Sequence, residues 1–185
     1  MPPIMIPANY WEGTMTVEFE YPWITPGAIC ELSQFIQPHY DVLEFGSGGS
    51  TLFFARRCRS VTSFETLSPW YEKMKTVLSE KKIGNAKLVY ATNIEDMLKN
   101  LGSSRFDVVL IDCVETSRVD LAMKSPSLAK PGGVVIVDNY RAEFCKGIDE
   151  FFRMKCTVQK SFDDLHWVGE GTKLYYLTGA CSTQG

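Results

Sequence analysis

Short apolar runs alternate with helical patterns along this chain, and this alternation limits its fold more than any other feature. The runs lie at 41–45, 60–64, 87–91, 106–112 and 134–139. Each run is apolar on both faces, which is typical of parallel strands covered by helices on both sides of a sheet. Between two of the runs, Ser68 and Pro69 form an N-cap and a first turn, a typical start for a connecting helix. The sequence therefore predicts an α/β fold.

The end of the chain departs from this alternation. Two runs, 156–162 and 173–178, follow one another across a polar loop with no helical pattern between them. They predict an antiparallel hairpin that closes the sheet. A chain of 185 residues accommodates one sizeable core. We therefore expect a proline-rich and aromatic arm over 1–25, a single domain over 26–178 and a short tail over 179–185.

Composition disfavours several classes of protein. Nineteen basic and 22 acidic residues give a net charge of −3, which does not suit a surface that binds a polynucleotide. The six cysteines are scattered without a close pair, which disfavours a zinc cluster or a disulfide scaffold. The first residues lack the features of a signal peptide, and no apolar run is long enough to cross a membrane. We therefore expect a cytoplasmic protein with no membrane partner.

A glycine-rich loop, GSGGS at 46–50, follows the first apolar run, and Glu65 directly follows the next run. Glycines in such a loop let the backbone approach a ligand, and the helix start that follows offers free N–H donors. A carboxylate at the end of the second strand can accept hydrogen bonds from ribose hydroxyls. The pattern predicts a nucleoside-binding or dinucleotide-binding site, although a tight turn alone would also use these glycines.

Two residues near this loop discriminate between the cofactors that such a site binds. Thr51 stands where a dinucleotide-binding loop has its third glycine, and Glu44 puts a carboxylate where a pyrophosphate would pass. S-adenosylmethionine has no phosphate and carries a sulfonium and an ammonium group, so Glu44 and Glu65 would both find partners. The charges favour S-adenosylmethionine over NAD. The alternatives are an NAD-dependent oxidoreductase and a nucleoside-binding scaffold without catalysis.

Four segments of the chain resemble the signature segments of class I (Rossmann-like) S-adenosylmethionine-dependent methyltransferases, and in particular of small O-methyltransferases. These segments are DVLEFGSGGST, SVTSFE, FDVVLID and KPGGVVIVDN, in this order. The resemblance covers residues 26–178. It implies a three-layer Rossmann-like sandwich whose seven-stranded sheet is mostly parallel, with an antiparallel last strand.

The same resemblance implies how the loop region holds the cofactor. Glu44 and the 46–50 loop would hold the methionine part, and Glu65 would hold the ribose. Ser50 departs from the family, which usually has a glycine at this position. Both acids could instead be helix caps or members of surface ion pairs.

Three further residues are implied to lie along the cofactor. Asn93 would approach the adenine, although an asparagine at a helix start is also a typical N-cap. Asp112 and Cys113 would lie beside the methyl donor. The full set of predicted cofactor-binding residues is Glu44, Gly46, Ser47, Gly48, Gly49, Ser50, Glu65, Asn93, Asp112 and Cys113.

Oxygen ligands follow two neighbouring strands of the predicted sheet. Asp112 ends one strand, and Asp138 and Asn139 end the next, so the three side chains are expected to converge. The trio resembles the metal site of catechol-type and caffeoyl-CoA-type O-methyltransferases, which implies Mg²⁺ or another divalent cation that activates the acceptor hydroxyl. Glu115 stands where a catalytic lysine would be expected. In the alternative, Asp112 only borders the cofactor, Asp138 caps the next helix and the base lies elsewhere.

His166 is the candidate base that needs no metal. It lies in the polar loop between the last two runs, and the usual pKa of histidine suits proton removal near neutral pH. Its apolar neighbours also permit a packing role. Arg118 is expected either to steer an anionic substrate group or to begin a solvated helix. The predicted catalytic residues are Asp112, Asp138 and His166.

The acceptor is expected to be a small molecule or a saccharide. An aromatic arm with few positive charges suits a small hydroxylated molecule better than a nucleic acid. The chain leaves no room for an inserted cap domain, which predicts a shallow or partner-completed pocket and raises the hypothesis of a homodimer. The sequence therefore predicts an S-adenosylmethionine-dependent methyltransferase that transfers a methyl group to a hydroxyl by in-line displacement.

Overall fold

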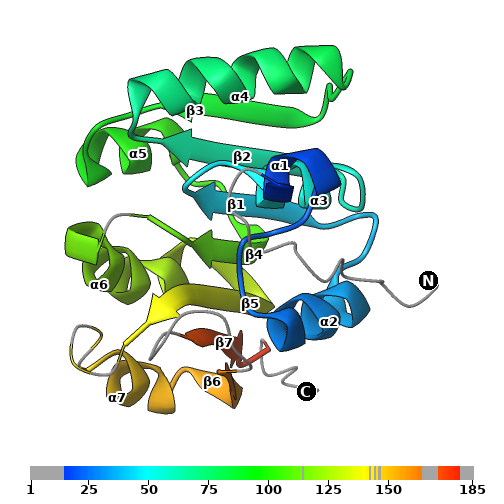
Figure 1. Cartoon of the computed structure of the whole chain (residues 1–185). Coiled ribbons are helices and arrows are strands. Elements are labelled where there is room, and N and C mark those ends of the chain that lie inside the picture. The colour runs from blue at the N-terminus through cyan, green and yellow to red at the C-terminus, as the bar shows by residue number, and fades with distance from the viewer. Residues whose placement is uncertain are drawn as a thin grey trace, which may run out of the picture.

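One seven-stranded sheet organises the residues that the structure describes, which are 15–113, 115–141, 143, 145, 147–163 and 171–179. In this computed structural model the strand order is β3-β2-β1-β4-β5-β7-β6 (Figure 1). The strands are β1 (Asp41–Phe45), β2 (Ser60–Glu65), β3 (Ala86–Tyr90), β4 (Phe106–Ile111), β5 (Ala129–Tyr140), β6 (Cys156–Phe162) and β7 (Gly171–Leu177). β7 runs antiparallel to both of its neighbours, and the other pairings are parallel. The predicted α/β fold, with a mostly parallel sheet and an antiparallel last strand, is confirmed.

Helices cover both faces of this sheet, as buried parallel strands require. The helices are α1 (Met15–Phe19), α2 (Pro26–Phe35), α3 (Gly49–Ala55), α4 (Ser68–Glu80), α5 (Ile94–Leu101), α6 (Glu115–Lys124) and α7 (Ile148–Arg153), with a 3₁₀ turn at Ser125–Ser127. On one face, α2 and α3 pack through Leu32 and Phe53. On the other face, α5, α6 and α7 pack through Met97, Leu121 and Phe152. Within the described part of the chain, no helix is long and apolar enough to span a membrane.

Parallel pairing brings the carboxyl ends of β1, β2, β4 and β5 to one edge of the sheet, which we call the carboxyl edge. Glu44 of β1 lies opposite Ser63 of β2 and Leu110 of β4. From β1, the strand order grows in one direction through β2 and in the other through β4. Open α/β sheets bind ligands at this kind of reversal, beyond the carboxyl ends of the strands. Glu44, Glu65, Asp112 and Asp138 therefore share one edge.

The strand expected at 134–139 is longer than predicted. β5 begins at Ala129, so the segment 130–133 (KPGG), whose proline and glycines predict a turn, belongs to the strand. Lys130 forms an ion pair of 2.7 Å with Asp107, which holds this segment against β4. The pairing of β5 with β4 shifts its register here, and this irregularity accommodates the two glycines.

The sequence pattern over 142–152 predicts a helix, and the observed helix begins later than this pattern does. α7 starts at Ile148, and Gly147 occupies its N-cap position with a φ of 89°. This left-handed conformation favours glycine and interrupts a helix. The local sequence pattern placed the helix correctly but not its first turn.

Helix α1, which belongs to the predicted arm, packs against the start of α3. A Cβ on Gly49 would lie 2.0 Å from the carbonyl oxygen of Tyr21 and 2.4 Å from that of Thr16. The Tyr21 N–H donates to the Thr16 carbonyl over 3.0 Å, which closes the turn after α1. Glycine is therefore the residue that permits this contact. Residues 15–25 pack with the sheet domain, while the boundary at 25/26 stays a prediction.

Replacing Gly49 by alanine tests this contact. The added methyl group meets backbone oxygens that no side-chain rotation can move aside, so Gly49→Ala should lower the free energy of unfolding by roughly 1–3 kcal/mol. Gly84→Ala is the control, because a Cβ at Gly84 meets nothing within 4 Å. The control should change stability by less than about 0.5 kcal/mol. Urea denaturation measures both variants, and equal stabilities would contradict the close packing of α1 on α3.

Candidate active site

Glu44 places a carboxylate inside the protein at the end of β1. Its side chain is fully buried. The Thr51 hydroxyl donates to Glu44 Oε2 over 2.6 Å, and the same hydroxyl oxygen accepts the Gly48 N–H over 3.0 Å. Glu44 Oε1 has no hydrogen-bond partner among the described residues. A buried acceptor in this state is suited to a donor on a ligand.

The environment of Glu44 disfavours its charge. Burial raises the pKa of Glu44 to about 7, and the charge of Asp112 adds a smaller contribution. The nearby hydroxyls of Ser50, Thr51 and Ser63 oppose this shift. A cationic ligand beside Glu44 would stabilise the ionised form, because an opposite charge lowers the pKa of a carboxyl group.

Glu65 ends β2, where four donors hold its carboxylate. Oε2 accepts hydrogen bonds from the N–H (3.1 Å) and the hydroxyl (2.7 Å) of Ser47. Oε1 accepts the backbone N–H groups of Thr66 (2.8 Å) and Leu67 (2.9 Å). The Trp70 indole N–H donates to the Ser47 carbonyl over 2.7 Å. The structure thus joins the glycine loop to the predicted ribose-binding acid, which already accepts a hydrogen bond from a hydroxyl group.

The three glycines of the loop have different surroundings. Gly46 has a φ of 106°, and a Cβ there would lie 1.9 Å from the carbonyl oxygen of Asp112, so glycine lets the loop run against the end of β4. Gly49 allows the close approach of α1. Around Gly48, a Cβ would meet nothing within 4 Å. The sequence predicts that these glycines let the backbone approach a ligand. In the structure, Gly46 and Gly49 allow neighbouring backbone to pack closely, and Gly48 alone of the three borders open space.

Asp112 directly follows β4, Asp138 lies near the end of the neighbouring strand β5, and the two carboxyl groups influence one another. Asp138 is buried, and its Oδ1 accepts a hydrogen bond of 2.5 Å from the Thr172 hydroxyl, whose oxygen accepts the Thr25 N–H over 3.0 Å. Burial raises the pKa of Asp138 well above its usual value, and the charge of Asp112 adds to this effect. Burial likewise raises the pKa of Asp112 to about 6. The alternative in which Asp138 caps the next helix is wrong, because Gly147 occupies that position.

Arg118 of α6 brings a positive charge to the same edge. Its side chain is buried, and Nη2 donates to the carbonyl oxygen of Cys113 (2.6 Å) and, more weakly, to Oδ1 of Asn139 (3.4 Å). The charge of Arg118 lowers the pKa of both Asp112 and Asp138, which partly opposes the effect of burial. The alternative in which Arg118 begins a solvated helix is therefore wrong.

The predicted metal ligands Asp112, Asp138 and Asn139 lie around this guanidinium group. The described residues contain no group of three or more His, Cys, Asp or Glu side chains that could hold a metal ion, so a site here would depend on the amide oxygen of Asn139 as its third ligand. A divalent cation among these ligands would be repelled by the charge of Arg118 and would compete with it for the Asn139 oxygen. The residues present therefore do not fit the predicted magnesium site.

The remaining predicted site residues are Asn93, Cys113 and His166. Asn93 caps α5, because its Oδ1 accepts the Asp96 N–H (2.9 Å) and its Nδ2 donates to the Asp96 carboxylate (2.7 Å). Its approach to the adenine stays a prediction. Burial raises the pKa of the Cys113 thiol to about 12, so this group stays protonated at neutral pH. His166 lies outside the described residues, as do Tyr10 and Trp11 of the arm.

Three threonines of this edge are absent from the predicted site residues. Thr51 is considered in the sequence only as a missing glycine, although its hydroxyl accepts the Gly48 N–H as the third-position side chain of a capping box does. Thr25 precedes Pro26, a typical N-cap pattern, yet its side chain makes no cap hydrogen bond. Nothing in the sequence signals Thr172, because only the antiparallel pairing of β5 with β7 brings it to Asp138.

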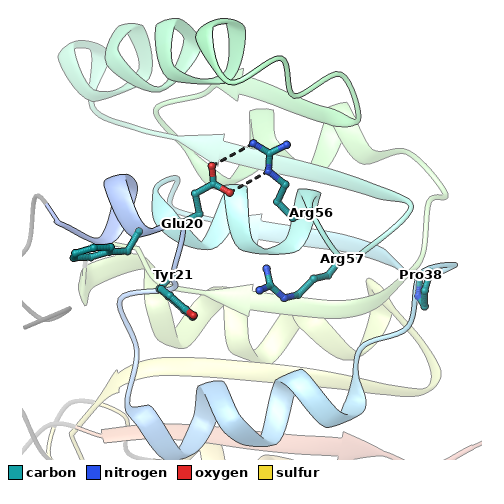
Figure 2. A pocket seen from close by; sticks show the side chains of 6 residues that line it. Glu20, Tyr21, Pro38, Arg56 and Arg57 are labelled. Atoms are coloured by element: carbon teal, nitrogen blue, oxygen red, sulfur yellow. Dashed lines mark hydrogen bonds and ion pairs between the residues drawn. The ribbon is translucent and has the colours of Figure 1, made fainter. Parts of the chain in front are cut away.

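A pocket of about 420 Å³ lies at the other end of α3. It is lined by Phe19, Glu20, Tyr21, Pro38, Arg56 and Arg57. Figure 2 shows Glu20 and Arg56 pointing toward one another, and they form an ion pair of 3.0 Å. The Arg57 guanidinium lies over the Phe53 ring, 4.0 Å from its centroid, and donates to the Phe53 carbonyl. The charges of this pocket have partners, unlike Glu44 Oε1 at the carboxyl edge.

Comparison with known proteins identifies the fold. No family model matches the sequence, and no curated protein matches it. Among solved structures, the chain is similar to the O-methyltransferase TomG from Streptomyces achromogenes, which is involved in tomaymycin synthesis and was solved with S-adenosylmethionine. The two chains are 19% identical, the match covers 95% of this chain and 92% of TomG, and the TM-score is 0.67. The chain has the class I methyltransferase fold.

Two further structures share this fold. An O-methyltransferase from Bacillus cereus, solved with S-adenosylhomocysteine, is 15% identical, with 95% of this chain and 93% of that chain covered and a TM-score of 0.68. An rRNA methylase from Streptococcus thermophilus is 15% identical, with 80% of this chain and 92% of that chain covered and a TM-score of 0.64. The same fold therefore occurs in methyltransferases with different acceptors.

Glu44→Gln tests the buried acid, because glutamine can keep the hydrogen bond from Thr51 and removes the charge. Folding raises the pKa of Glu44 from 4.5 to about 7. The stability that the protonated carboxyl contributes is therefore complete below pH 4.5, and it is lost as the pH rises through about 7. The variant should therefore gain stability relative to the wild type between about pH 5 and pH 8, by roughly 1–3 kcal/mol. Urea denaturation at both pH values measures this difference. A difference that does not change with pH would contradict the assignment.

Proposed function

We propose that this protein is an S-adenosylmethionine-dependent methyltransferase that methylates a hydroxyl group of a small molecule or saccharide. The main support is the buried Glu44 carboxylate, whose Oε1 has no partner among the described residues, at the carboxyl edge of a methyltransferase fold. An ammonium group would satisfy this oxygen, whereas a phosphate would be repelled. The charge at this position therefore favours the sulfonium cofactor over a dinucleotide.

In this proposal the glycine loop and two acids hold the cofactor. Glu44 and the 46–50 loop bind the methionine part, beside the open space at Gly48. Glu65 binds the ribose, and its hydrogen bond from the Ser47 hydroxyl is one that a ribose hydroxyl can replace. This exchange preserves the number of donors around the Glu65 carboxylate.

The remaining residues act on the acceptor side and the adenine side. The bound cofactor supplies an electrophilic methyl group, which the acceptor oxygen attacks in line with the bond to sulfur. Asp112 and Cys113 border the methyl group, and Asn93 borders the adenine. Asp138, oriented by its hydrogen bond from Thr172, accepts the hydroxyl proton. His166, outside the described residues, is the alternative base.

A hydroxylated small molecule or saccharide is the proposed acceptor. TomG and the Bacillus cereus protein support methylation of oxygen, whereas the rRNA methylase shows that RNA acceptors occur with this fold. The net charge of −3 favours a small acceptor over RNA, because RNA binding depends largely on cationic contacts to phosphates. The proposal includes a cytoplasmic location and a homodimer, both of which stay predictions from the sequence.

Two alternative functions make different predictions for ligand binding. An NAD-dependent oxidoreductase would bind NAD and would not respond to S-adenosylhomocysteine. A non-catalytic scaffold would bind S-adenosylhomocysteine but would transfer no methyl group to any acceptor. Calorimetry with both ligands, followed by an acceptor screen, separates the three functions.

Glu65→Gln should weaken binding of S-adenosylhomocysteine about 10-fold to 100-fold, because a charged acceptor of ribose hydrogen bonds becomes neutral. Isothermal titration calorimetry measures the dissociation constant. The control is Glu72→Gln, since Glu72 lies on the exposed side of α4 in a solvent-accessible pair with Lys75. An unchanged constant in Glu65→Gln would refute the ribose role, and tight NAD binding without binding of S-adenosylhomocysteine would refute the proposed function.

Asp138→Asn should lower kcat by about 10²-fold to 10⁴-fold, because the variant cannot accept the hydroxyl proton. Transfer of a labelled methyl group is measured on a panel of phenols, saccharides and a ribosomal RNA fragment. Asp120→Asn, at an exposed position of α6, is the control. Wild-type activity of Asp138→Asn would remove Asp138 from the mechanism, and transfer to the RNA fragment alone would contradict the proposed acceptor class.

A further inference from the structure

Buried polar atoms without partners concentrate at the carboxyl edge. Within the described part of the chain, three buried side-chain atoms have no hydrogen-bond partner: Thr25 Oγ1, Glu44 Oε1 and Arg118 Nε. Glu44 lies near the end of β1, and Arg118 contacts Cys113 beyond β4 and Asn139 near the end of β5. The N–H of Thr25 reaches Asp138 through Thr172. An unpaired buried polar group costs roughly 1–3 kcal/mol, so three of them at one edge indicate bonds that a ligand completes.

Arg118 is the cation among these groups. Its side chain is 5% exposed, and both of its hydrogen bonds go to neutral oxygens, the Cys113 carbonyl and the Asn139 amide. One nitrogen, Nη2, makes both of these bonds, and the buried Nε–H has no acceptor in the described part of the chain. A guanidinium group donates several hydrogen bonds in one plane and stays charged at any physiological pH.

The position of this charge coincides with the predicted metal site. Asn139 is within hydrogen-bond distance of Arg118, and Asp112 and Asp138 lie close enough to respond electrostatically to its charge. These are the three side chains that the sequence assigns to a divalent cation. The guanidinium supplies one positive charge at this position, where a divalent cation would bring two.

We propose that Arg118 replaces the divalent metal of this site: its guanidinium group holds the acceptor's hydroxyl oxygen and stabilises the negative charge that develops there, so that methyl transfer needs no metal. This inference rests on the proposed function, because it concerns the same acceptor site. Arg118 is then a catalytic residue that contacts the reacting oxygen.

Charge and atoms balance in this step. The acceptor O–H bond breaks and its proton passes to Asp138. The oxygen forms a bond to the methyl carbon, and the electron pair of the breaking carbon–sulfur bond returns to sulfur. Arg118 keeps its protons throughout and acts only through hydrogen bonding and charge, which are most effective in a site shielded from water.

The first test measures metal binding rather than activity. The wild-type protein in complex with S-adenosylhomocysteine is titrated with Mn²⁺, and free Mn²⁺ is followed by electron paramagnetic resonance. We expect no binding that depends on the site, and therefore the same titration curve for wild type and Asp138→Asn. Binding to the wild type that Asp138→Asn abolishes would overturn the proposal.

The second test measures the effect of Arg118 on an oxygen anion. The probe is 4-nitrophenol, whose ionised form has a distinct absorption band, and it is titrated with pH in the complex with S-adenosylhomocysteine. The wild type should favour ionisation of the bound probe by about tenfold or more, as an adjacent cation does. Arg118→Met should lose this effect, and Arg118→Lys should retain part of it.

Controls separate this role from a structural one. Arg105→Met is the matched variant, because Arg105 also donates to backbone carbonyls but is exposed and far from the carboxyl edge. It should leave the ionisation of the probe unchanged. Should Arg118→Met not fold, the comparison of wild type with Arg118→Lys decides. Equal ionisation in wild type and the Arg118 variant, or no enhancement in the wild type, would overturn the proposal.

Binding of S-adenosylhomocysteine is measured before either test. Failure of this binding would count against the proposed function itself. Normal binding together with a failed test would count against the role of Arg118 alone.

Discussion

The buried carboxylate of Glu44 is the constraint on which the carboxyl edge depends. A carboxylate without solvent needs donors, and Thr51 supplies one from the first turn of α3 while it accepts the Gly48 N–H. This chain of bonds positions the glycine loop relative to β1. It also explains why a threonine stands where a dinucleotide-binding loop has a glycine. One oxygen of Glu44 is left without a donor in the described residues, so the protein retains an acceptor that suits a donor on a ligand.

The pKa values of carboxyl groups shift in opposite directions at the two ends of the sheet. At the amino end, the Arg59 guanidinium, with smaller contributions from Ser60 and Lys130, holds the pKa of Asp41 well below its usual range. At the carboxyl edge, burial raises the pKa of Asp112 and Asp138, and Arg118 is the positive charge that opposes it. The difference follows from ion pairing, which is abundant at one end and sparse at the other. Electrostatic free energy is therefore stored at the edge where ligands bind in this fold, as is common at functional sites.

Much of the candidate site could be predicted from the sequence, because the decisive patterns are local. An apolar run followed by glycines predicts a strand and a tight loop, and acids at the ends of such runs must lie on one edge once the strands are parallel. Glu44, Glu65 and Asp138 were found in this way. The different surroundings of Gly46, Gly48 and Gly49 could not be found, because they depend on which distant backbone packs against each glycine. The same holds for the segment 130–133, which joins β5 through contacts with β4.

The sequence by itself determined the α/β architecture, the order of its elements and the placement of acids beside a glycine loop, since periodicity and turn residues act over a few neighbouring positions. Only the tertiary structure decided how the charges at that edge are balanced. Arg118 could have begun a solvated helix, and its role changed when packing of α6 buried it beside Asp112 and Asp138. Thr172 reaches Asp138 only because β7 runs antiparallel to β5. Burial sets the local dielectric, and long-range strand pairing sets the hydrogen-bond partners. Neither can be predicted from a short stretch of sequence, because both depend on residues that are distant along the chain.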